Sequence, residues 1–455
     1  MITATFAILS LLQAPIQNVA PQPLIPPVQS QLVDLGGQVS AVKISADEAG
    51  KIALKSNLQL RLARALILSA HGNSIQIESA LLPNLDLSAS LNNNSSLHDN
   101  GINITTNTVT GVVTSLGNSN GNGNSSSVNL TLTQLLFDFG HTVALVRQAK
   151  ASETALTHAL TRSEQDVVYQ TKVAFYLFAL DLQLISVEES NLKDRQAQLD
   201  LAAARVAAGP GEPSDLLVAK TNVADTQQLL IQARATAQVA QIALAITMGI
   251  DPRTPIGASD STEANDDQTF LTCYSQALKL RPDLLQNLEL IRSAGFEVQA
   301  ARSNNAPILN AVAGYSAQGD PDVSQHQALS LGLSLNWSIF DGFNTRGLSI
   351  RARADLETAR ANLANLQLSI GSDVATAWTN LQSALQRLPV TQNEQTLATE
   401  SLRIASGRFK AGIGAFIAVT DAEASLVIAE QAVVGAKNSI QTARASLHHA
   451  IGSTP

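Results

Sequence analysis

Three stretches of the chain alternate large apolar residues with small or polar ones. They are LDLSASL at 85–91, VNLTLT at 128–133 and LSLGLSLNW at 329–337. A period of two places alternate side chains on opposite faces of a strand, so one face of each meets an apolar medium and the other meets water. The segments are about 8 to 11 residues long, which is the length of a tilted strand that crosses a bilayer.

Long runs rich in Ala, Leu, Gln and Glu predict long helices. Residues 141–207 contain no proline, and as one helix they would extend roughly 100 Å. A helix of that length belongs to a coiled coil or a bundle. An earlier helix is expected at 45–80, opened by the capping-box pattern SADE at 45–48 and ended before Pro83. The turns GPGEP at 209–213 and GIG at 412–414 would fold the long helices into pairs.

The second half of the chain repeats the first. At an offset of 203 residues Phe137-Asp138 matches Phe340-Asp341, and Arg205 matches Arg408. Upstream of the strands the offset is 224, so the first copy holds 21 additional residues of loop. Each unit is therefore predicted to contain a helix, two strands and a pair of long helices.

This repeat sets the expected domain boundaries. We expect repeat 1 at 45–250, a polar linker at 251–269 and repeat 2 at 270–455. Residues 1–20, with the short apolar stretch FAILSLL, are expected to be an export signal, with a frayed N-terminus or a misplaced start codon as the alternative. Residues 21–44 form a Pro-rich linker.

The surroundings of the strands favour a membrane barrel over an ordinary half-buried sheet. Residues 92–127 are a stretch of Asn, Ser, Gly and Thr, expected to be a solvated loop with nothing to pack. No Asp, Glu, Lys or Arg lies between residues 100 and 137 or between 323 and 340. Four aromatic residues cluster at strand ends, as an interfacial girdle would. They are Phe137, Phe139, Trp337 and Phe340.

Four strands cannot close a barrel, and hydrocarbon does not tolerate unpaired strand edges. The chain is therefore expected to assemble, with two copies giving eight strands and three giving twelve. An open lumen needs more than eight strands. The residues expected to face the lumen are small and polar: Asp86, Ser88, Asn129, Thr131, Thr133, Ser330, Ser334 and Asn336.

Composition excludes several other classes of protein. The chain has 455 residues with a net charge of −8 and 15% charged residues, and its scattered Lys and Arg argue against nucleic-acid binding. The single cysteine, Cys273, excludes an internal disulfide framework and a multi-cysteine zinc site. No uninterrupted apolar run approaches 18 residues, which predicts no helical membrane span.

Catalytic chemistry is not predicted. We find no nucleophile–base arrangement, phosphate-binding loop or metal motif, and so expect no enzyme, cofactor or metal. His448 and His449 are expected on a helix surface, and Cys273 as a small buried side chain.

In this order and spacing, the motifs resemble those of the TolC-like outer-membrane efflux proteins. The motifs are the tandem repeat, LLP at 81–83, LFD at 136–138, LRPD at 280–283, AP at 306–307, WSIFDG at 337–342 and RFKAG at 408–412. The resemblance covers about residues 45–452. It implies a mixed α/β membrane protein: a homotrimer whose four strands per chain form a 12-stranded transmembrane β-barrel in outer-membrane lipid, continued by a long periplasmic α-helical barrel.

The same resemblance implies an exit duct of a tripartite efflux pump or a type I secretion system. Its partners would be a periplasmic adaptor and an inner-membrane transporter, docking at the helix-pair turns. An arginine before each turn would stabilise the turn by hydrogen bonding. The alternative interpretations are that the turns have no docking role and that the arginines are solvated surface residues. The implied docking residues are Arg205, Ala208, Gly209 and Pro210 in repeat 1 and Arg408, Ala411, Gly412 and Ile413 in repeat 2.

A periplasmic aperture is also implied by the resemblance. Asp421 matches an aspartate that rings the closed aperture, where three carboxylates would favour cations, and Asp215 matches an aspartate of the tip. The family pattern has a second aspartate and an arginine where this chain has Ala418 and Gly414, which leaves the partner of Asp215 open.

The rival interpretation is a periplasmic coiled-coil adaptor or scaffold without a barrel. It would explain the long helices but not four charge-poor alternating strands.

Overall fold

The computed structural model describes residues 42–94, 103–106, 113–117, 123–209, 211–259, 268–320 and 324–453. The chain divides into a small unit, Met1–Val42 with Pro255–Gly257, and a large unit that holds the rest. The expected export signal and most of the Pro-rich linker lie outside the described residues, as does Pro210. Two short strands, β1 (Val42–Ile44) and β6 (Ile256–Ala258), lie near the ends of the first repeat.

The first helix begins as the capping box predicts but is shorter than expected. The Ser45 side chain accepts a hydrogen bond from the Glu48 backbone, and the Glu48 side chain accepts one from the Ser45 backbone. The helix does not continue to residue 80: α1 (Ala46–Ser56) ends at Asn57, which opens α2 (Leu58–Glu78). The break is stabilised from outside, because Asn57 Nδ2 donates to the Thr247 carbonyl at 2.9 Å.

The second half of the chain shows a matching break. Here α5 (Phe270–Leu280) ends at Arg281, and Pro282 opens α6 (Pro282–Ser303). Proline is favourable at the first position of a helix because its missing N–H has no partner there in any case. Arg281 Nη1 donates to the Ala450 carbonyl, as Asn57 does to Thr247. In each half, therefore, the break between two helices contacts the C-terminal end of a later helix: α4 (Pro213–Met248) in the first half and α8 (Phe416–Ile451) in the second.

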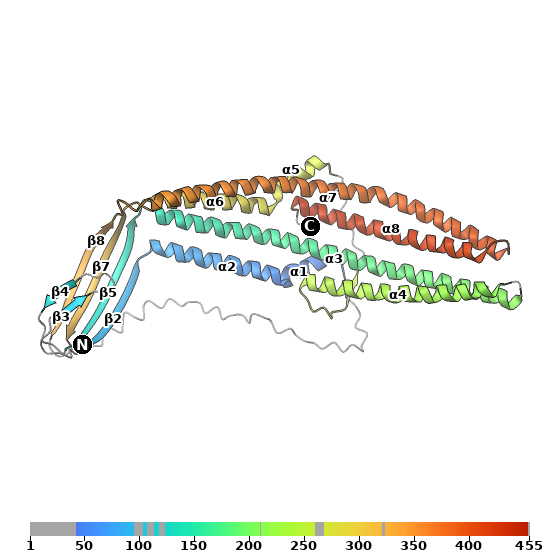
Figure 1. Cartoon of the computed structure of the whole chain (residues 1–455), viewed down its shortest axis with the longest axis horizontal. Helices are drawn as coiled ribbons and strands as arrows, with labels where there is room; N and C mark the ends of the chain where they lie inside the picture. The colour runs from blue at the N-terminus through green and yellow to red at the C-terminus, as the bar shows by residue number, and fades with distance from the viewer. Residues whose placement is uncertain are drawn as a thin grey trace. The chain divides into compact units, whose positions relative to one another are not determined.

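Two long helical hairpins form the greater part of the large unit (Figure 1). In the first, α3 (His141–Ala208) turns into α4 (Pro213–Met248); in the second, α7 (Asn344–Lys410) turns into α8 (Phe416–Ile451). The second hairpin packs through small and branched residues, among them Val374 and Ala377 of α7 and Ala443 of α8. Small side chains let the helix axes approach closely. Pro389 lies within α7.

A four-stranded antiparallel sheet lies at the opposite end of the large unit from the hairpin turns (Figure 1). Its order is β2 (Asn84–Asn94), β5 (Gly123–Phe137), β7 (Ile308–Asp320) and β8 (Ser324–Asn336). The register places Leu85, Leu132, Ala313 and Leu331 side by side in one row across the sheet. The next row along β2 contains Asp86, Thr131, Gly314 and Ser330. The predicted separation of apolar and polar faces is therefore continuous over all four strands.

The expectation of an unstructured loop at 92–127 is wrong in part. β2 continues to Asn94 and β5 begins at Gly123, so the strands extend into the polar stretch. Between them β3 (Asn103–Thr106) pairs antiparallel with β4 (Val113–Gly117). Asn, Ser and Thr have few apolar atoms to bury, but backbone hydrogen bonds still allow strand pairing.

One helix of the described part is long and apolar enough to cross a membrane by length and composition alone. It is α4, with a mean hydropathy of 1.3 over 18 residues. The prediction from uninterrupted apolar runs missed it because Thr and Gln interrupt its Ala and Leu. Core helices of soluble proteins meet the same criterion, and α4 packs along α3 in the hairpin.

Candidate functional site

The sheet exposes one strongly apolar face. In β8 the leucines alternate outward, with 81% of Leu329 and 86% of Leu331 exposed. Leu87 of β2 and Tyr315 of β7 extend the same face across the sheet. Contiguous apolar surface of this kind marks a contact with another protein or with lipid.

The aromatic residues predicted at the membrane interface all lie at strand ends and are exposed. Phe137 and Phe139 have ring centroids 4.7 Å apart. Trp337 and Phe340 follow β8, and Phe340 packs edge-on against Phe343 at 5.6 Å.

Each turn from strand to long helix is held by an aspartate whose role the sequence did not reveal. Asp138 is buried and accepts hydrogen bonds from the Thr142 backbone at 2.6 Å and the Gly140 backbone at 3.1 Å. Burial raises the pKa of Asp138, but the hydrogen bonds from Thr142 and Gly140 outweigh it and hold this pKa below its ordinary value. In the second half, Asp341 accepts from the Thr345 backbone at 2.8 Å. Hydrogen bonds from the Thr345 side chain and backbone lower the pKa of Asp341. The bonds from the Thr142 and Thr345 amides each satisfy an amide in the first turn of a long helix.

Arg205, beside the turn of the first hairpin, contacts the turn of the second hairpin. Arg205 Nη1 donates to the Phe409 carbonyl at 2.8 Å, and its guanidinium carbon lies 4.5 Å from the centroid of the Phe409 ring. Arg408, its repeat equivalent, is exposed. The two arginines therefore differ in environment, although they match in sequence.

The remaining predicted tip residues are exposed at the turns themselves. Gly209 and Gly412 have φ values of 97° and 78°, which side-chain-bearing residues rarely adopt. Ala208, Ala411 and Ile413 are exposed beside them. Gly412 lies close to the Arg205 guanidinium, since a Cβ there would be 3.9 Å from Arg205 Nη2.

A cavity of about 260 Å³ lies between the two tips. Arg205, Glu212 and Asp215 give it a charged lining, and Phe409 and Phe416 form its apolar part. Gly414 also lines it, and a Cβ at this position would lie 2.9 Å from the Phe409 amide nitrogen. A larger residue at Gly414 would therefore force the turn to shift.

The two aspartates predicted at the aperture have different surroundings. Asp215, in the first turn of α4, is half-buried and lines the cavity between the tips. Asp421 is exposed in the second turn of α8 and does not line that cavity.

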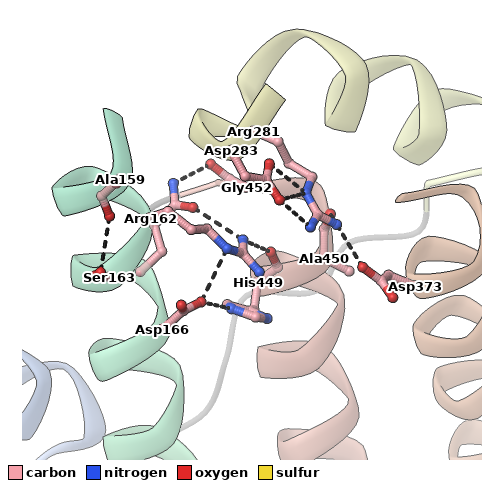
Figure 2. Close-up of polar contacts among 11 residues, drawn as sticks. Ala159, Arg162, Ser163, Asp166, Arg281, Asp283, Asp373, His449, Ala450 and Gly452 are labelled. Atoms are coloured by element: carbon pink, nitrogen blue, oxygen red, sulfur yellow. Dashed lines mark hydrogen bonds and ion pairs between the residues drawn. The ribbon is translucent and has the colours of Figure 1, made fainter. Parts of the chain in front are cut away.

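Figure 2 shows a polar cluster at the C-terminal end of α8 that the sequence analysis missed. His449 Nε2 lies 2.6 Å from Asp166 Oδ1 of α3, and its ring stacks on Tyr169 at 4.5 Å. The prediction of a surface His449 holds only in part, because the side chain is 21% exposed and contacts α3. Burial raises the pKa of Asp166, but the hydrogen bond with His449 and the charge of Arg162 outweigh it and leave this pKa low.

Two arginines complete the same cluster: Arg162, one turn before Asp166 on α3, and Arg281, at the break between α5 and α6. Arg162 donates to the His449 carbonyl at 3.2 Å, and buried Arg281 binds both Asp283 and Asp373. The last carbonyls of a helix carry partial negative charge, so these guanidiniums stabilise the end of α8. Spacing along the chain gave no signal for this, because α3, α6, α7 and α8 meet only in the folded molecule.

Comparison with known proteins establishes the family. The model of the family described as outer membrane efflux protein matches residues 50–249 and again 273–453. The chain belongs to the outer membrane efflux protein family, whose members are channel proteins.

Two curated relatives agree with this assignment, and a solved structure has a similar fold. The chain is 26% identical over 284 residues to the outer membrane efflux protein BepC of Brucella suis, covering 61% of each. It is 28% identical over 269 residues to the protein CyaE of Bordetella pertussis, covering 56% of this chain and 55% of CyaE. The chain thus spans less than two thirds of these relatives. The fold is similar to that of the outer-membrane channel OprN, with a TM-score of 0.77, 19% identity and 90% of each chain covered.

Proposed function

We propose that this protein is the outer-membrane exit duct of a tripartite efflux pump or a type I secretion system. It conducts solutes passively from the periplasm to the exterior of a Gram-negative-type cell. Three copies form a 12-stranded barrel in the outer membrane, continued by a periplasmic barrel of helical hairpins. Membership of the outer membrane efflux family supports this function and does not favour the soluble adaptor or scaffold.

The observation that carries the proposal is the open sheet with one exposed leucine face. β2 and β8 are its outer strands, and their free edges need partners if the leucines meet lipid. Pairing β8 of one copy with β2 of the next satisfies both edges. Repeating that contact three times closes a cylinder.

The opposite face of the sheet supports a water-filled lumen. Small and polar residues occupy it along β5 and β8, including Asn129, Thr131 and Ser334. Twelve strands enclose more space than such short side chains fill.

The tips supply the docking surface for an adaptor in this proposal. The alanines and glycines at 208–209 and 411–412 leave the backbone accessible to an incoming hairpin. Phe409 and Phe416 offer apolar contact between the tips. The inner-membrane transporter, which determines the cargo and supplies the energy, contacts the duct through that adaptor.

The aperture is proposed at Asp421. Its exposure on α8 supports a position where three copies surround one axis. Ala418 and Gly414 stand in place of the charged residues of the family pattern, so fewer charged residues would hold this aperture closed. Asp421→Ala should raise single-channel conductance or weaken cation block in planar bilayers, while Asp225→Ala, an exposed aspartate of α4, should change neither. Unchanged conductance and cation sensitivity would remove Asp421 from the aperture.

We further propose the two-repeat division at 45–250 and 270–455. The repeated order of broken helix, strands and hairpin supports it, as do the two matches of the family model.

The main test is assembly in membranes. The full chain, expressed in a Gram-negative host, should fractionate with the outer membrane, migrate as a heat-modifiable oligomer and form channels in planar bilayers. A stable, detergent-free monomer would overturn the proposal.

A further inference from the structure

A cavity of about 230 Å³ lies where α1 meets α3 and the C-terminal end of α8. Its walls are mainly apolar, and they include Leu54 of α1, Val168 of α3 and Ala445 of α8. An apolar cavity of about 150 Å³ is large enough to hold benzene. The space between these three helices can therefore hold a substituted aromatic ring.

The second half of the chain provides a comparison, because its repeat has an aromatic ring at the matching contact. The offset of 224 relates Gly50 of α1 to Tyr274 of α5, and the offset of 203 relates Val168 of α3 to Gly371 of α7. A Cβ at Gly50 would lie 3.3 Å from Val168 Cγ1. A Cβ at Gly371 would lie 3.6 Å from Tyr274 Cε2. The same two positions thus meet in each half, but only the second pair includes a ring.

The Tyr274 ring belongs to an aromatic pair that the first half lacks. It stacks on Phe270 with ring centroids 6.1 Å apart, and both rings pack against the apolar cluster between α5, α7 and α8. The corresponding residues of α1 are Gly50 and Ala46, which are both small. The first half therefore keeps as a cavity a space that the second half fills with aromatic side chains.

Charges at the cavity favour an anionic ligand. The two carboxylates of the lining already have partners, since Asp47 lies 2.8 Å from Lys172 Nζ and Glu164 lies 3.5 Å from Arg64. Lys51 of α1 also lines the cavity, and among the described residues it forms no ion pair. A carboxylate on the ligand would give Lys51 a partner.

We propose that this cavity binds a small aromatic carboxylate, with the ring in the space that Tyr274 fills in the second half and the carboxylate against Lys51. Tyr169 supplies an aromatic wall, because it lines the cavity and stacks on His449 at 4.5 Å. A ligand held between α1, α3 and α8 stabilises their contact. Binding needs only the fold of one chain and does not depend on conduction.

Equilibrium dialysis of the detergent-solubilised full chain with 4-hydroxybenzoate tests the site. This probe has the phenol ring of tyrosine and a carboxyl group that is ionised at neutral pH. The wild type should bind one probe per chain with saturation. Phenol and benzylamine, the neutral and cationic analogues, should bind at least about tenfold more weakly. Benzylamine binding as tightly as 4-hydroxybenzoate, or no saturable binding of 4-hydroxybenzoate, would overturn the proposal.

Two variants separate filling of the cavity from disturbance of the helices. G50Y/V168G gives the first half the residue pair of the second half, so the chain's own ring should occupy the cavity and abolish binding. Val168→Gly alone makes the same change in α3 but leaves the cavity open, so it should still bind the probe. A double variant that binds as well as V168G would show that the ligand does not occupy this space.

Lys51→Met tests the charge without filling the cavity. It should weaken binding of 4-hydroxybenzoate about tenfold and leave binding of phenol unchanged. Lys55→Met is the matched control, because Lys55 lies one turn further along α1 and outside the cavity lining. If K51M binds 4-hydroxybenzoate as tightly as K55M does, the assignment of the carboxylate to Lys51 is wrong.

Amide hydrogen exchange locates the bound probe. Adding 4-hydroxybenzoate should slow exchange at 46–56 and 164–172 in the wild type and in K55M, because the ligand ties α1 to α3. Exchange in G50Y/V168G should not respond to the probe. Slowing of exchange only at other segments would place the ligand elsewhere and overturn the proposal.

Discussion

Arg205 connects two turns that are about 200 residues apart in the chain. Its hydrogen bond to the Phe409 carbonyl and its position over the Phe409 ring hold the first tip against the second. The matching Arg408 is exposed, so sequence equivalence does not imply structural equivalence here. A repeat duplicates residues, but each copy meets a different neighbour.

Arg205→Lys should loosen the second tip. A lysine is a point charge without the planar fork that both stacks on Phe409 and reaches its carbonyl. We expect local opening at 408–414 to become about 1 to 3 kcal/mol easier, measured by amide hydrogen exchange. Arg408→Lys is the matched control and should change little; equal effects of both substitutions would contradict the assigned contact.

Asp138 gives the turn into α3 a dependence on pH. Its pKa is lower in the folded chain than in the unfolded chain, so the stabilisation is full above the unfolded value of about 3.9. It declines as pH falls through the lower folded value. Asp138→Asn should cost about 1 kcal/mol at neutral pH.

Thermal unfolding of the wild type and D138N checks this prediction. The difference in midpoint should be present at pH 7 and diminish in acid below about pH 4. A difference that grows as the pH falls would contradict the sign of the pKa shift.

At the scale of the elements, local sequence patterns determine the faces of the strands, whereas packing against distant residues determines where the helices break. The alternation in β8 predicts a strand with two unlike faces, and the register carries those faces across β7 and β5 into β2. The breaks at Asn57 and Arg281 were not predicted, because the partners that hold them, Thr247 and Ala450, lie about 170 to 190 residues away.

Substitutions on the two faces of β8 should have opposite outcomes. Leu331→Lys places a charge on the exposed leucine face and should cost about 2 to 4 kcal/mol if that face meets the middle of the bilayer. Ser334→Lys lies on the polar face of the same strand and should assemble normally. The measurement is the fraction of heat-modifiable oligomer in the outer membrane. Equal assembly of the two variants would show that the leucine face does not meet lipid.

At the scale of the whole molecule, the sheet topology makes the assembly testable without channel activity. β5 and β7 lie between β2 and β8, which puts the outer strands about 14 Å apart at the usual strand spacing. A disulfide needs Cα atoms within about 7 Å. A cysteine on β2 can therefore pair with one on β8 only between chains.

Ser88→Cys combined in turn with Ser330→Cys, Gly332→Cys or Ser334→Cys should give trimers on non-reducing gels in at least one register. Ser88 and Asn129 are register partners within one chain, so the S88C/N129C control should remain monomeric. If no β2–β8 pair links chains in membranes, the closed trimer is not the assembly.

By itself the sequence determined the kinds of element and the faces of the strands, because local periodicity records whether a side chain meets water or an apolar medium. It also determined the repeat and the family resemblance, since these depend on the order of motifs along the chain. Only the tertiary structure decided which charged side chains are buried together. His449 with Asp166, Arg205 with Phe409 and Arg195 with Glu423 come from helices distant in sequence, and their pairing depends on how the hairpins pack.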